Sequence, residues 1–337
     1  MSYNVPVEGL IESLYVDDSW LIEQFAGDRL LVWGTNANGQ LGDNTNVDKS
    51  SPVQTIAGGA NWKQVACGST HTVAIKTDGT LWVYGYNAYV QLGDNTTSSK
   101  SSPVQTIAGG TNWKQVAGGN RHSAAIKTDG TLWTWGANTY GTLGDNTNVD
   151  KSSPVQTITG GTNWKQVACG SSHNVAIKSD GTLWTWGYNS NGQIGDNTIT
   201  NRSSPVQTIT GGTNWKQVAC GYGLTAAIKS DGTLWTWGRN TNGQLGDNTT
   251  GNKSSPVQTV AGGTNWKQVS CGNQHAAAIK FDGTLWSWGT ITGDNTNIMR
   301  SSPVQTLIGG TNWKQVACGY TMTAAVTINN IYTTGVE

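Results

Sequence analysis

The sequence predicts an all-β fold, a single seven-bladed β-propeller whose blades are four-stranded antiparallel sheets. Three observations lead to this prediction. A unit of about 51 residues recurs along the 337-residue chain. Each unit contains four short runs of β-branched and aromatic residues, separated by Gly, Asn and Asp turn signals. The composition is skewed as a copied unit would make it, with 45 Gly and 17 Trp against only two Phe. Four antiparallel strands repeated at such a period are typical of propeller blades.

The clearest marker of the repeat is Asn-Trp-Lys-Gln-Val, whose Trp stands at positions 62, 113, 164, 215, 266 and 313. The spacing is 51 residues except for the last, which is 47 because four residues are missing after Gly289. In the second copy the predicted strands cover 62–67, 71–76, 80–85 and 103–107. The sequence Lys-Thr-Asp-Gly-Thr between the second and third strands predicts a hairpin.

The third strand of the second copy is bulky on both faces, as expected where blades pack against each other. We predict that Trp82 and Tyr84 point to one neighbouring blade and Leu81 and Val83 to the other.

The repeat also predicts how one domain, residues 1–337, is organised. Residues 11–57 are a degenerate first copy, because their apolar positions align with the second copy after a shift of 51 residues. The last copy, 309–337, ends after three predicted strands. Residues 1–10 contain Pro6-Val7-Glu8, which is close to the Pro-Val-Gln of the outer strands. We therefore predict that Val5 to Leu10 pair with Ile331 to Gly335 and close the ring. The regular copies between them are 58–108, 109–159, 160–210, 211–261 and 262–308.

Charge and hydropathy exclude several classes of protein. Lysine plus arginine and aspartate plus glutamate each total 20, so no overall charge attracts nucleic acid or an anionic membrane. No apolar stretch is long enough to span a bilayer, and the first residues lack the features of a signal peptide. The expected location is the cytoplasm as the protein is made, with assembly into a virus particle as an extension of that expectation.

The cysteines, histidines and loop aspartates each occupy one position per copy. Cys67, Cys169, Cys220, Cys271 and Cys318 are expected to be small buried side chains without disulfides. His71, His122, His173 and His275 are expected to bond to a nearby turn, since one His per blade cannot assemble a zinc site. The Gly-Asp-Asn-Thr sequences fit Asx turns better than calcium loops. No Ser–His–Asp set is recognisable, so we predict no enzyme activity, no cofactor and no metal.

Basic residues also recur once per copy and form three rings. One ring precedes each outer-strand proline by three residues, in the loops where the copies differ, and it is the candidate partner-binding site: Lys49, Lys100, Lys151, Arg202, Lys253 and Arg300. A second ring follows each marker Trp, from Lys63 to Lys314. A third closes each second strand: Lys76, Lys127, Lys178, Lys229 and Lys280. The alternative for all three rings is a solubilising surface paired with the aspartates.

One copy reads Cys-Gly-x-x-His-x-x-Ala-Ile-Lys-x-Asp-Gly-x-Leu-Trp-x-Trp-Gly, followed by Asn-Gly-Gln-Leu-Gly-Asp-Asn-Thr and a Pro. This pattern resembles the RCC1 repeat, the unit of the regulator of chromosome condensation and its relatives, over nearly the whole chain. The resemblance implies a seven-bladed propeller and leaves the function open. Guanine-nucleotide exchange in the family depends on an inserted loop wedge, which is missing here. Plant ultraviolet reception depends on Gly-Trp-Arg-His-Thr units, which are also missing.

The sequence therefore favours a non-enzymatic interaction or structural module on a rigid propeller. Its expected partner is a protein or other macromolecule, with no specific signal for nucleic acid. Near-identical copies and polar loops suggest a component of a virion or of a microbial surface. The alternative function is an exchange-factor-like regulator of a small GTPase.

Overall fold

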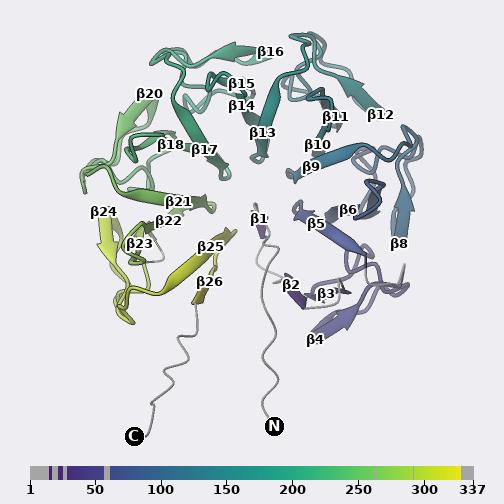
Figure 1. Ribbon diagram of the computed structural model, residues 1–337, viewed down its shortest axis with the longest axis horizontal. Helices are drawn as coiled ribbons and strands as arrows, with labels where there is room; N and C mark the ends of the chain where they lie inside the picture. The colour runs from purple at the N-terminus through teal and green to yellow at the C-terminus, as the bar shows by residue number, and fades with distance from the viewer. Residues whose placement is uncertain are drawn as a thin grey trace, which may run out of the picture.

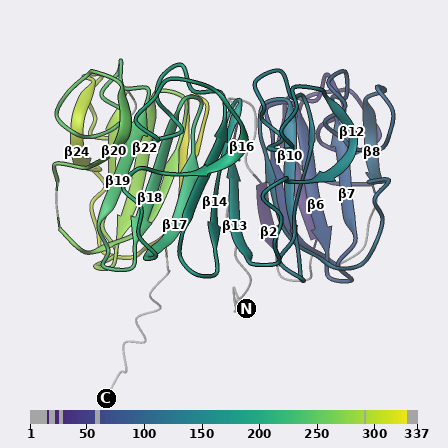
Figure 2. The same ribbon diagram turned by 90° about the horizontal axis from the view of Figure 1, so that it is seen from above.

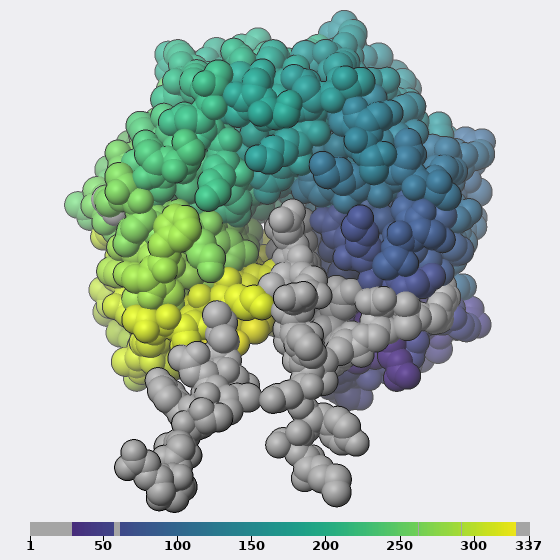
Figure 3. All heavy atoms as spheres, in the orientation of Figure 1, coloured from purple at the N-terminus to yellow at the C-terminus, as the bar shows by residue number. Residues whose placement is uncertain are grey.

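The computed structural model describes residues 15–16, 22–25, 29–56, 61–261, 263–290 and 292–327. These residues form 26 strands and no helix, grouped into seven sheets. The sheets stand around a common axis as the blades of a propeller (Figure 1). Seen edge-on, the strands run between two layers of loops (Figure 2). The space-filling view shows neighbouring blades in contact with one another from the blue part of the chain through green to yellow (Figure 3).

The four strands of a blade are called inner, second, third and outer, in their order across the sheet. The inner strands are β1 (Tyr15–Val16), β5 (Trp62–Cys67), β9 (Trp113–Gly118), β13 (Trp164–Cys169), β17 (Trp215–Cys220), β21 (Trp266–Cys271) and β25 (Trp313–Gly319). The second strands are β2 (Ile22–Phe25), β6 (His71–Lys76), β10 (His122–Lys127), β14 (His173–Lys178), β18 (Leu224–Lys229), β22 (His275–Lys280) and β26 (Thr323–Thr327). The third strands are β3 (Arg29–Gly34), β7 (Leu81–Gly85), β11 (Leu132–Gly136), β15 (Leu183–Gly187), β19 (Leu234–Gly238) and β23 (Leu285–Gly289). The outer strands are β4 (Lys49–Gln54), β8 (Lys100–Gln105), β12 (Lys151–Gln156), β16 (Arg202–Gln207), β20 (Lys253–Gln258) and β24 (Arg300–Gln305).

Five blades, from β5 to β24, are complete four-stranded antiparallel sheets. In the first blade β2, β3 and β4 pair with one another, while β1 pairs in parallel with β25 of the last blade. The register joins Tyr15 to Cys318 and Val16 to Gly319. The first described strand therefore meets the inner strand of the last blade near the axis (Figure 1). The predicted pairing of 5–10 with 331–335 lies outside the described residues.

The outer strands begin three residues earlier than the sequence predicts. In the second blade the outer strand covers Lys100–Gln105, where 103–107 was expected. A register shift between Val83 and Gly85 lets the ladder continue to a last pair, Gly85 with Lys100. The basic residue at the start of each outer strand is therefore held in a sheet and is not free in a loop.

The two ends of the blades carry different connections. At one end, the turn from inner to second strand meets the long loop from third to outer strand, and Tyr86 N donates to Thr70 O at 2.8 Å. At the other end, the hairpin between second and third strands meets the next inner strand, and Trp113 N donates to Gly79 O at 3.1 Å. We call these ends the long-loop face and the hairpin face.

The hydrophobic core lies between consecutive blades. Leu81 and Val83 pack with Trp113 and Trp135 of the following blade, whereas Tyr84 packs with Leu30 and other residues of the preceding one. This confirms the predicted division of the third strand between two neighbours. Every blade thus depends on the blades beside it for burial of its two faces.

Glutamines of the inner strands add hydrogen bonds across the same boundaries. Gln115 Nε2 donates to Val167 O at 3.1 Å, and Val167 N donates to Gln115 Oε1 at 3.0 Å. Gln217 makes the same pair of bonds to Val269 in a later blade. One side chain therefore extends the backbone pairing from blade to blade.

The tryptophans at the hairpin face enclose lysines. The Lys127 ammonium lies 4.7 Å from the ring centroid of Trp113 and 4.4 Å from that of Trp133. The two indoles meet edge to face, with centroids 6.4 Å apart. The same arrangement holds Lys76, Lys178, Lys229 and Lys280. This third ring of lysines, predicted as a surface ring, is held by cation–π contacts.

One buried asparagine organises each complete long loop. Asn138 Nδ2 donates to Asp145 Oδ1 at 3.0 Å and to the carbonyl oxygens of Thr147 and Val149 at 3.1 and 3.2 Å. Its Oδ1 accepts from Leu143 N at 2.8 Å. Equivalent asparagines stand at Asn36, Asn87, Asn189 and Asn240. The loops are therefore built on a fixed internal frame.

Replacing this asparagine should destabilise the protein measurably. Asn138→Ala leaves the buried Leu143 N–H and several loop acceptors without a partner, so the free energy of unfolding should fall by about 2–4 kcal/mol. The measurement is the midpoint of urea denaturation. Ser190→Ala, at an exposed position of the next long loop, is the control and should stay within about 0.5 kcal/mol of wild type. Equal stability of the two variants would contradict the role assigned to the asparagine.

Candidate functional site

The predicted basic ring lies at the outer edge of the long-loop face, and every member is ion-paired. Each basic side chain reaches the aspartate six residues before it, with N–O distances between 2.5 and 3.5 Å. The pairs are Lys49–Asp43, Lys100–Asp94, Lys151–Asp145, Arg202–Asp196, Lys253–Asp247 and Arg300–Asp294. Their basic side chains are 24–35% exposed and the carboxylates only 7–11%. The ring therefore presents partly compensated charge to solvent.

The aspartates of these pairs close the predicted Asx turns. Asp145 Oδ1 accepts from Thr147 N at 3.1 Å and from Thr147 Oγ1 at 2.8 Å. The following residue, Asn146, has a φ of +61°, a conformation that asparagine tolerates well. Burial alone would raise the pKa of Asp145, but hydrogen bonds from Thr147 and Asn138 and the nearby Lys151 lower it. Within the described ranges no group of three or more His, Cys, Asp or Glu side chains is placed to bind a metal ion.

The histidines bond to the next blade, and the expectation of a bond to a nearby turn is wrong. His71 Nε2 lies 2.9 Å from Ser123 Oγ, which donates to Gln91 O at 2.9 Å. Because Ser123 uses its hydrogen in that bond, His71 Nε2 is the donor to Ser123. His122, His173 and His275 contact Asn174, Thr225 and Thr323 in the same way.

Burial keeps these histidines neutral. It lowers the pKa of His71 and His173 to about 3 and that of His122 and His275 to about 4. Each imidazole is almost completely enclosed. The four rings therefore form structural hydrogen bonds between blades, and His71, His122 and His173 are the donors in theirs.

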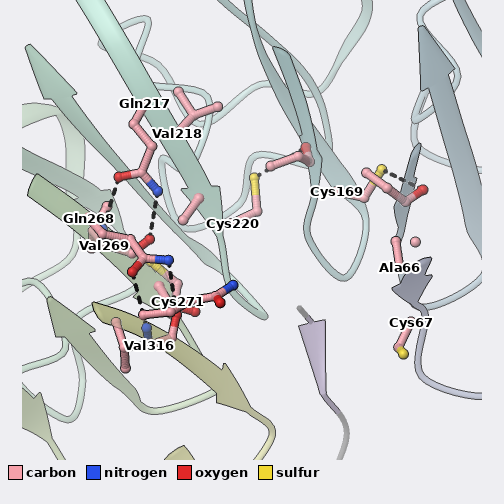
Figure 4. Close-up of a pocket in the computed structure, with 16 residues that line it drawn as sticks. Ala66, Cys67, Cys169, Gln217, Val218, Cys220, Gln268, Val269, Cys271 and Val316 are labelled. Carbon is pink, nitrogen blue, oxygen red and sulfur yellow. Dashed lines mark hydrogen bonds between the residues drawn. The ribbon is translucent and has the colours of Figure 1, made fainter. Parts of the chain in front are cut away.

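The inner strands line a pocket around the axis (Figure 4). Gln217 and Gln268 bridge to neighbouring strands in its wall. The five cysteines are buried and form no disulfide, as predicted, and Cys220 Sγ lies 3.5 Å from Ala168 O. Burial raises the pKa of all five thiols, so none is an activated nucleophile.

Tyrosine and arginine side chains gather on the long-loop face, at positions that differ between copies. In the turns and loop openings, Tyr86 and Tyr89 meet edge to face at 6.0 Å, and the Arg121 guanidinium lies 4.1 Å from the Tyr89 ring. The ring centroids of Tyr140 and Tyr188, which belong to neighbouring blades, lie 4.7 Å apart. We call the set the tyrosine–arginine surface; its members are Tyr86, Tyr89, Arg121, Tyr140, Tyr188, Tyr222, Arg239 and Tyr320.

The remaining members continue the surface over the later blades. The ring centroids of Tyr222 and Tyr320 lie 6.2 Å apart, and each side chain is more than a third exposed. Arg239 Nε donates to Thr241 Oγ1 at 3.2 Å. Among the described residues, neither Arg121 nor Arg239 forms an ion pair, in contrast to Arg202 and Arg300 of the basic ring. These two guanidinium groups therefore keep their charge uncompensated by a carboxylate among the described residues.

This surface was not predicted from the sequence, although a signal was present. Every described Trp belongs to the repeated scaffold, whereas six of the ten tyrosines stand in turns and loops at positions that differ between copies. Position 86, for example, is Tyr, while its equivalents are Thr35, Ala137, Tyr188, Arg239 and Thr290. Variation at the turns and loop openings of a copied scaffold indicates a surface free of structural constraint.

Comparisons with known proteins agree with the propeller architecture. The sequence profile described as the RCC1-like domain matches residues 29–337. The chain is 33% identical over 269 residues to the ultraviolet-B receptor UVR8 of Arabidopsis thaliana, covering 78% of this chain and 61% of the receptor. It is 32% identical over 232 residues to the probable E3 ubiquitin-protein ligase HERC4 of Homo sapiens, covering 66% of this chain and 20% of the ligase. The match thus spans about three fifths of the receptor and one fifth of the ligase.

Solved structures show the same fold. Human WBSCR16 superposes with a TM-score of 0.80 at 22% identity, covering 97% of this chain and 89% of that one. Yeast RCC1 (Prp20), solved with Kap60 bound, superposes with a TM-score of 0.79 at 20% identity, and the match covers 94% of this chain and 80% of that one.

The repeated blades, the family profile and these structures define a β-propeller built from RCC1 repeats. The chain belongs to the RCC1-like domain family. Members of this family serve as protein-interaction and regulatory modules, and their propellers are mostly non-catalytic.

The buried histidines predict a dependence of stability on pH. The unfolded chain binds protons near pH 6.5 whereas the folded histidines bind them only near pH 3 to 4, so stability should fall as pH drops through this window. At about pH 5 the loss should be on the order of 1–2 kcal/mol per histidine. The loop aspartates, whose pKa is lowered in the folded state, reduce the stability of the protein only at still lower pH.

The measurement is urea denaturation across this range, compared with a variant carrying His71→Leu, His122→Leu, His173→Leu and His275→Leu. Leucine already occupies this position at Leu224, where it is fully buried. The variant should show a flatter profile between pH 6.5 and 4. An equally steep profile would assign the acid sensitivity to other groups.

Proposed function

We propose that this protein is a non-enzymatic binding module whose protein partner docks on the tyrosine–arginine surface. The observation that supports this most directly is the concentration of copy-to-copy differences, as tyrosine and arginine, on one face of a repeated scaffold. Tyrosine and arginine are enriched among residues that dominate the energy of protein interfaces. On a rigid disc whose scaffold positions repeat, such differing side chains are where specificity for a partner would reside.

The geometry of the surface suits such a role. Tyr89 holds the Arg121 guanidinium against its ring, so little side-chain freedom is lost when a partner binds. Tyrosine offers a large contact area at low entropic cost together with a hydroxyl group for hydrogen bonds. The loops beneath are fixed by buried asparagines such as Asn87 and Asn138. The surface is thus prepared in advance of binding.

The basic ring from Lys49 to Arg300 forms the rim of the same proposed interface. Charges at an interface rim mainly affect the rate of association and its dependence on salt. The paired aspartates weaken the field of the ring, so its contribution to affinity should be small beside that of the central side chains.

Protein partners are favoured by the printed descriptions of similar structures. Yeast RCC1 was solved with Kap60, and Prp20p was studied for binding to Gsp1p and histones. We further propose a virion or microbial surface component, made in the cytoplasm and assembled there, on the basis of near-identical copies and Asn-, Thr- and Ser-rich loops. The alternative is an exchange-factor-like regulator of a small GTPase, for which a GTPase partner is the requirement.

The proposal is tested by crosslinking followed by substitution. A photoreactive phenylalanine analogue at Tyr140 in the native source should crosslink a protein that the same analogue at Thr128, on the hairpin face, leaves untouched. With that partner purified, Arg121→Ala combined with Tyr140→Ala and Tyr188→Ala should weaken binding by at least about 100-fold. Changing all six basic-ring residues to Ser should slow association and leave most of the affinity. Unchanged affinity of the triple variant would refute the tyrosine–arginine surface as the docking site.

A further inference from the structure

The lysines that follow the marker tryptophans remain exposed on the hairpin face. Lys63, Lys114, Lys165, Lys216 and Lys267 are the second residues of five consecutive inner strands. All five are exposed, and in the described part of the chain none lies within ion-pair distance of a carboxylate. Lys216 also lies 5.5 Å from the Phe281 ring centroid. Among the described residues, these five lysines thus lack the carboxylate partner that every member of the basic ring has.

Among the residues that the structure describes, the hairpin face carries an excess of positive charge. The five tryptophan-enclosed lysines add to the exposed ones, and cation–π contact leaves their charge in place. Opposing these ten lysines are five hairpin aspartates: Asp78, Asp129, Asp180, Asp231 and Asp282. The chain as a whole is neutral partly because its first 28 residues contain six acidic residues and no basic one. Whole-chain neutrality therefore conceals a cationic face.

Exposed aliphatic side chains lie on the outer circumference, next to the same face. They follow the outer strands, where Thr106 N donates to Leu81 O at the hairpin end of the third strand and Ile107 N donates to Gly93 O of the long loop. Each is more than half exposed, between 52% and 65%. The members are Ile56, Ile107, Ile158, Ile209, Val260 and Leu307. One exposed aliphatic residue is ordinary, but a repeated set around one rim marks an interaction surface.

We propose that the hairpin face binds the surface of an anionic lipid bilayer. Lysines would contact the headgroups while the aliphatic rim enters the boundary with the acyl chains, the combination that holds proteins on membranes without spanning them. Among the described residues no helix is long and apolar enough to cross a bilayer. The hairpin ends of the blades lie at a similar level (Figure 2), which suits an extended planar partner.

A lipid surface explains both features together. The ammonium group of one lysine per blade acts as a point charge, which suits a surface with spread-out negative charge. The named cations of this face are all lysines, so none can bind a phosphate group bidentately as arginine does. An acidic protein or a nucleic acid would account for the lysines and leave the aliphatic rim unexplained. The proposal does not depend on the tyrosine–arginine surface, which faces the opposite way and stays free for a protein.

The first experiment is sedimentation with vesicles. The protein should bind phosphatidylcholine vesicles containing about one third phosphatidylserine, should not bind pure phosphatidylcholine, and should be released by salt. Changing Lys63, Lys114, Lys165, Lys216 and Lys267 to Gln should weaken binding at least about tenfold. The matched control changes Lys49, Lys100, Lys151, Arg202 and Lys253 to Gln, which removes the same charge from the other face and should bind nearly as wild type. Failure to bind, or equal weakening of both variants, overturns the proposal.

The second experiment identifies the face. Because the native cysteines are buried, a polarity-sensitive maleimide dye should label only an introduced thiol, at Ile158→Cys on the hairpin face or at Ser190→Cys on the long-loop face. Vesicles should shift the emission to the blue only for Ile158→Cys. A shift confined to Ser190→Cys, or preference for a soluble polyanion with no response to vesicles, contradicts a lipid-binding hairpin face. Melting temperatures close to wild type establish that each variant is folded.

Discussion

Packing of each blade against the next is the interaction on which the rest of this structure depends. Leu81 and Val83 lie in a cluster that joins Val73 and Ile75 of their own blade to Trp113, Val116 and Trp135 of the following one. The glutamine bridges and the histidine bonds cross the same boundaries, joining residues 52 positions apart. Repeat proteins of this kind gain stability at interfaces between units. A residue change in one copy is therefore felt by two blades, which accounts for the near identity of the scaffold positions.

The same constraint determines where the chain can differ between copies. The turn backbone on the long-loop face is held from below, by bonds such as Tyr86 N to Thr70 O and by the buried asparagines. Side chains at the turn tips take no part in these bonds. Tyr140 can consequently stand where other copies have Asn, and Arg121 where they have Ser or Thr, without altering the loops that carry them. On the proposed function, binding specificity and fold stability depend on different residues of one repeat.

Features that depend on local pattern were predictable from the sequence, and those that depend on contacts between copies were not. The period, the strand order and the two-sided burial of Trp82 and Leu81 follow from residue spacing alone. The partner of His71 does not, because Ser123 lies one copy away and nothing in the sequence singles it out. The outer strands begin early since a register shift before Gly85 extends the ladder, and such a shift has no clear sequence signature.

Charge shows this limit most plainly, because three rings of basic residues with the same periodicity have three different environments. Lys151 is paired with Asp145, Lys127 lies between two indoles, and Lys114 is exposed without a carboxylate nearby. Pairing with a nearby carboxylate cancels most of the charge of the first kind in the field outside the protein, whereas the other two kinds keep theirs. The neutral total therefore says little about either face. On one side of the disc, basic residues whose charge is compensated by aspartates surround the tyrosines; on the other side, the lysines have no carboxylate nearby. The two faces therefore differ in chemistry, and two different partners can bind without competing.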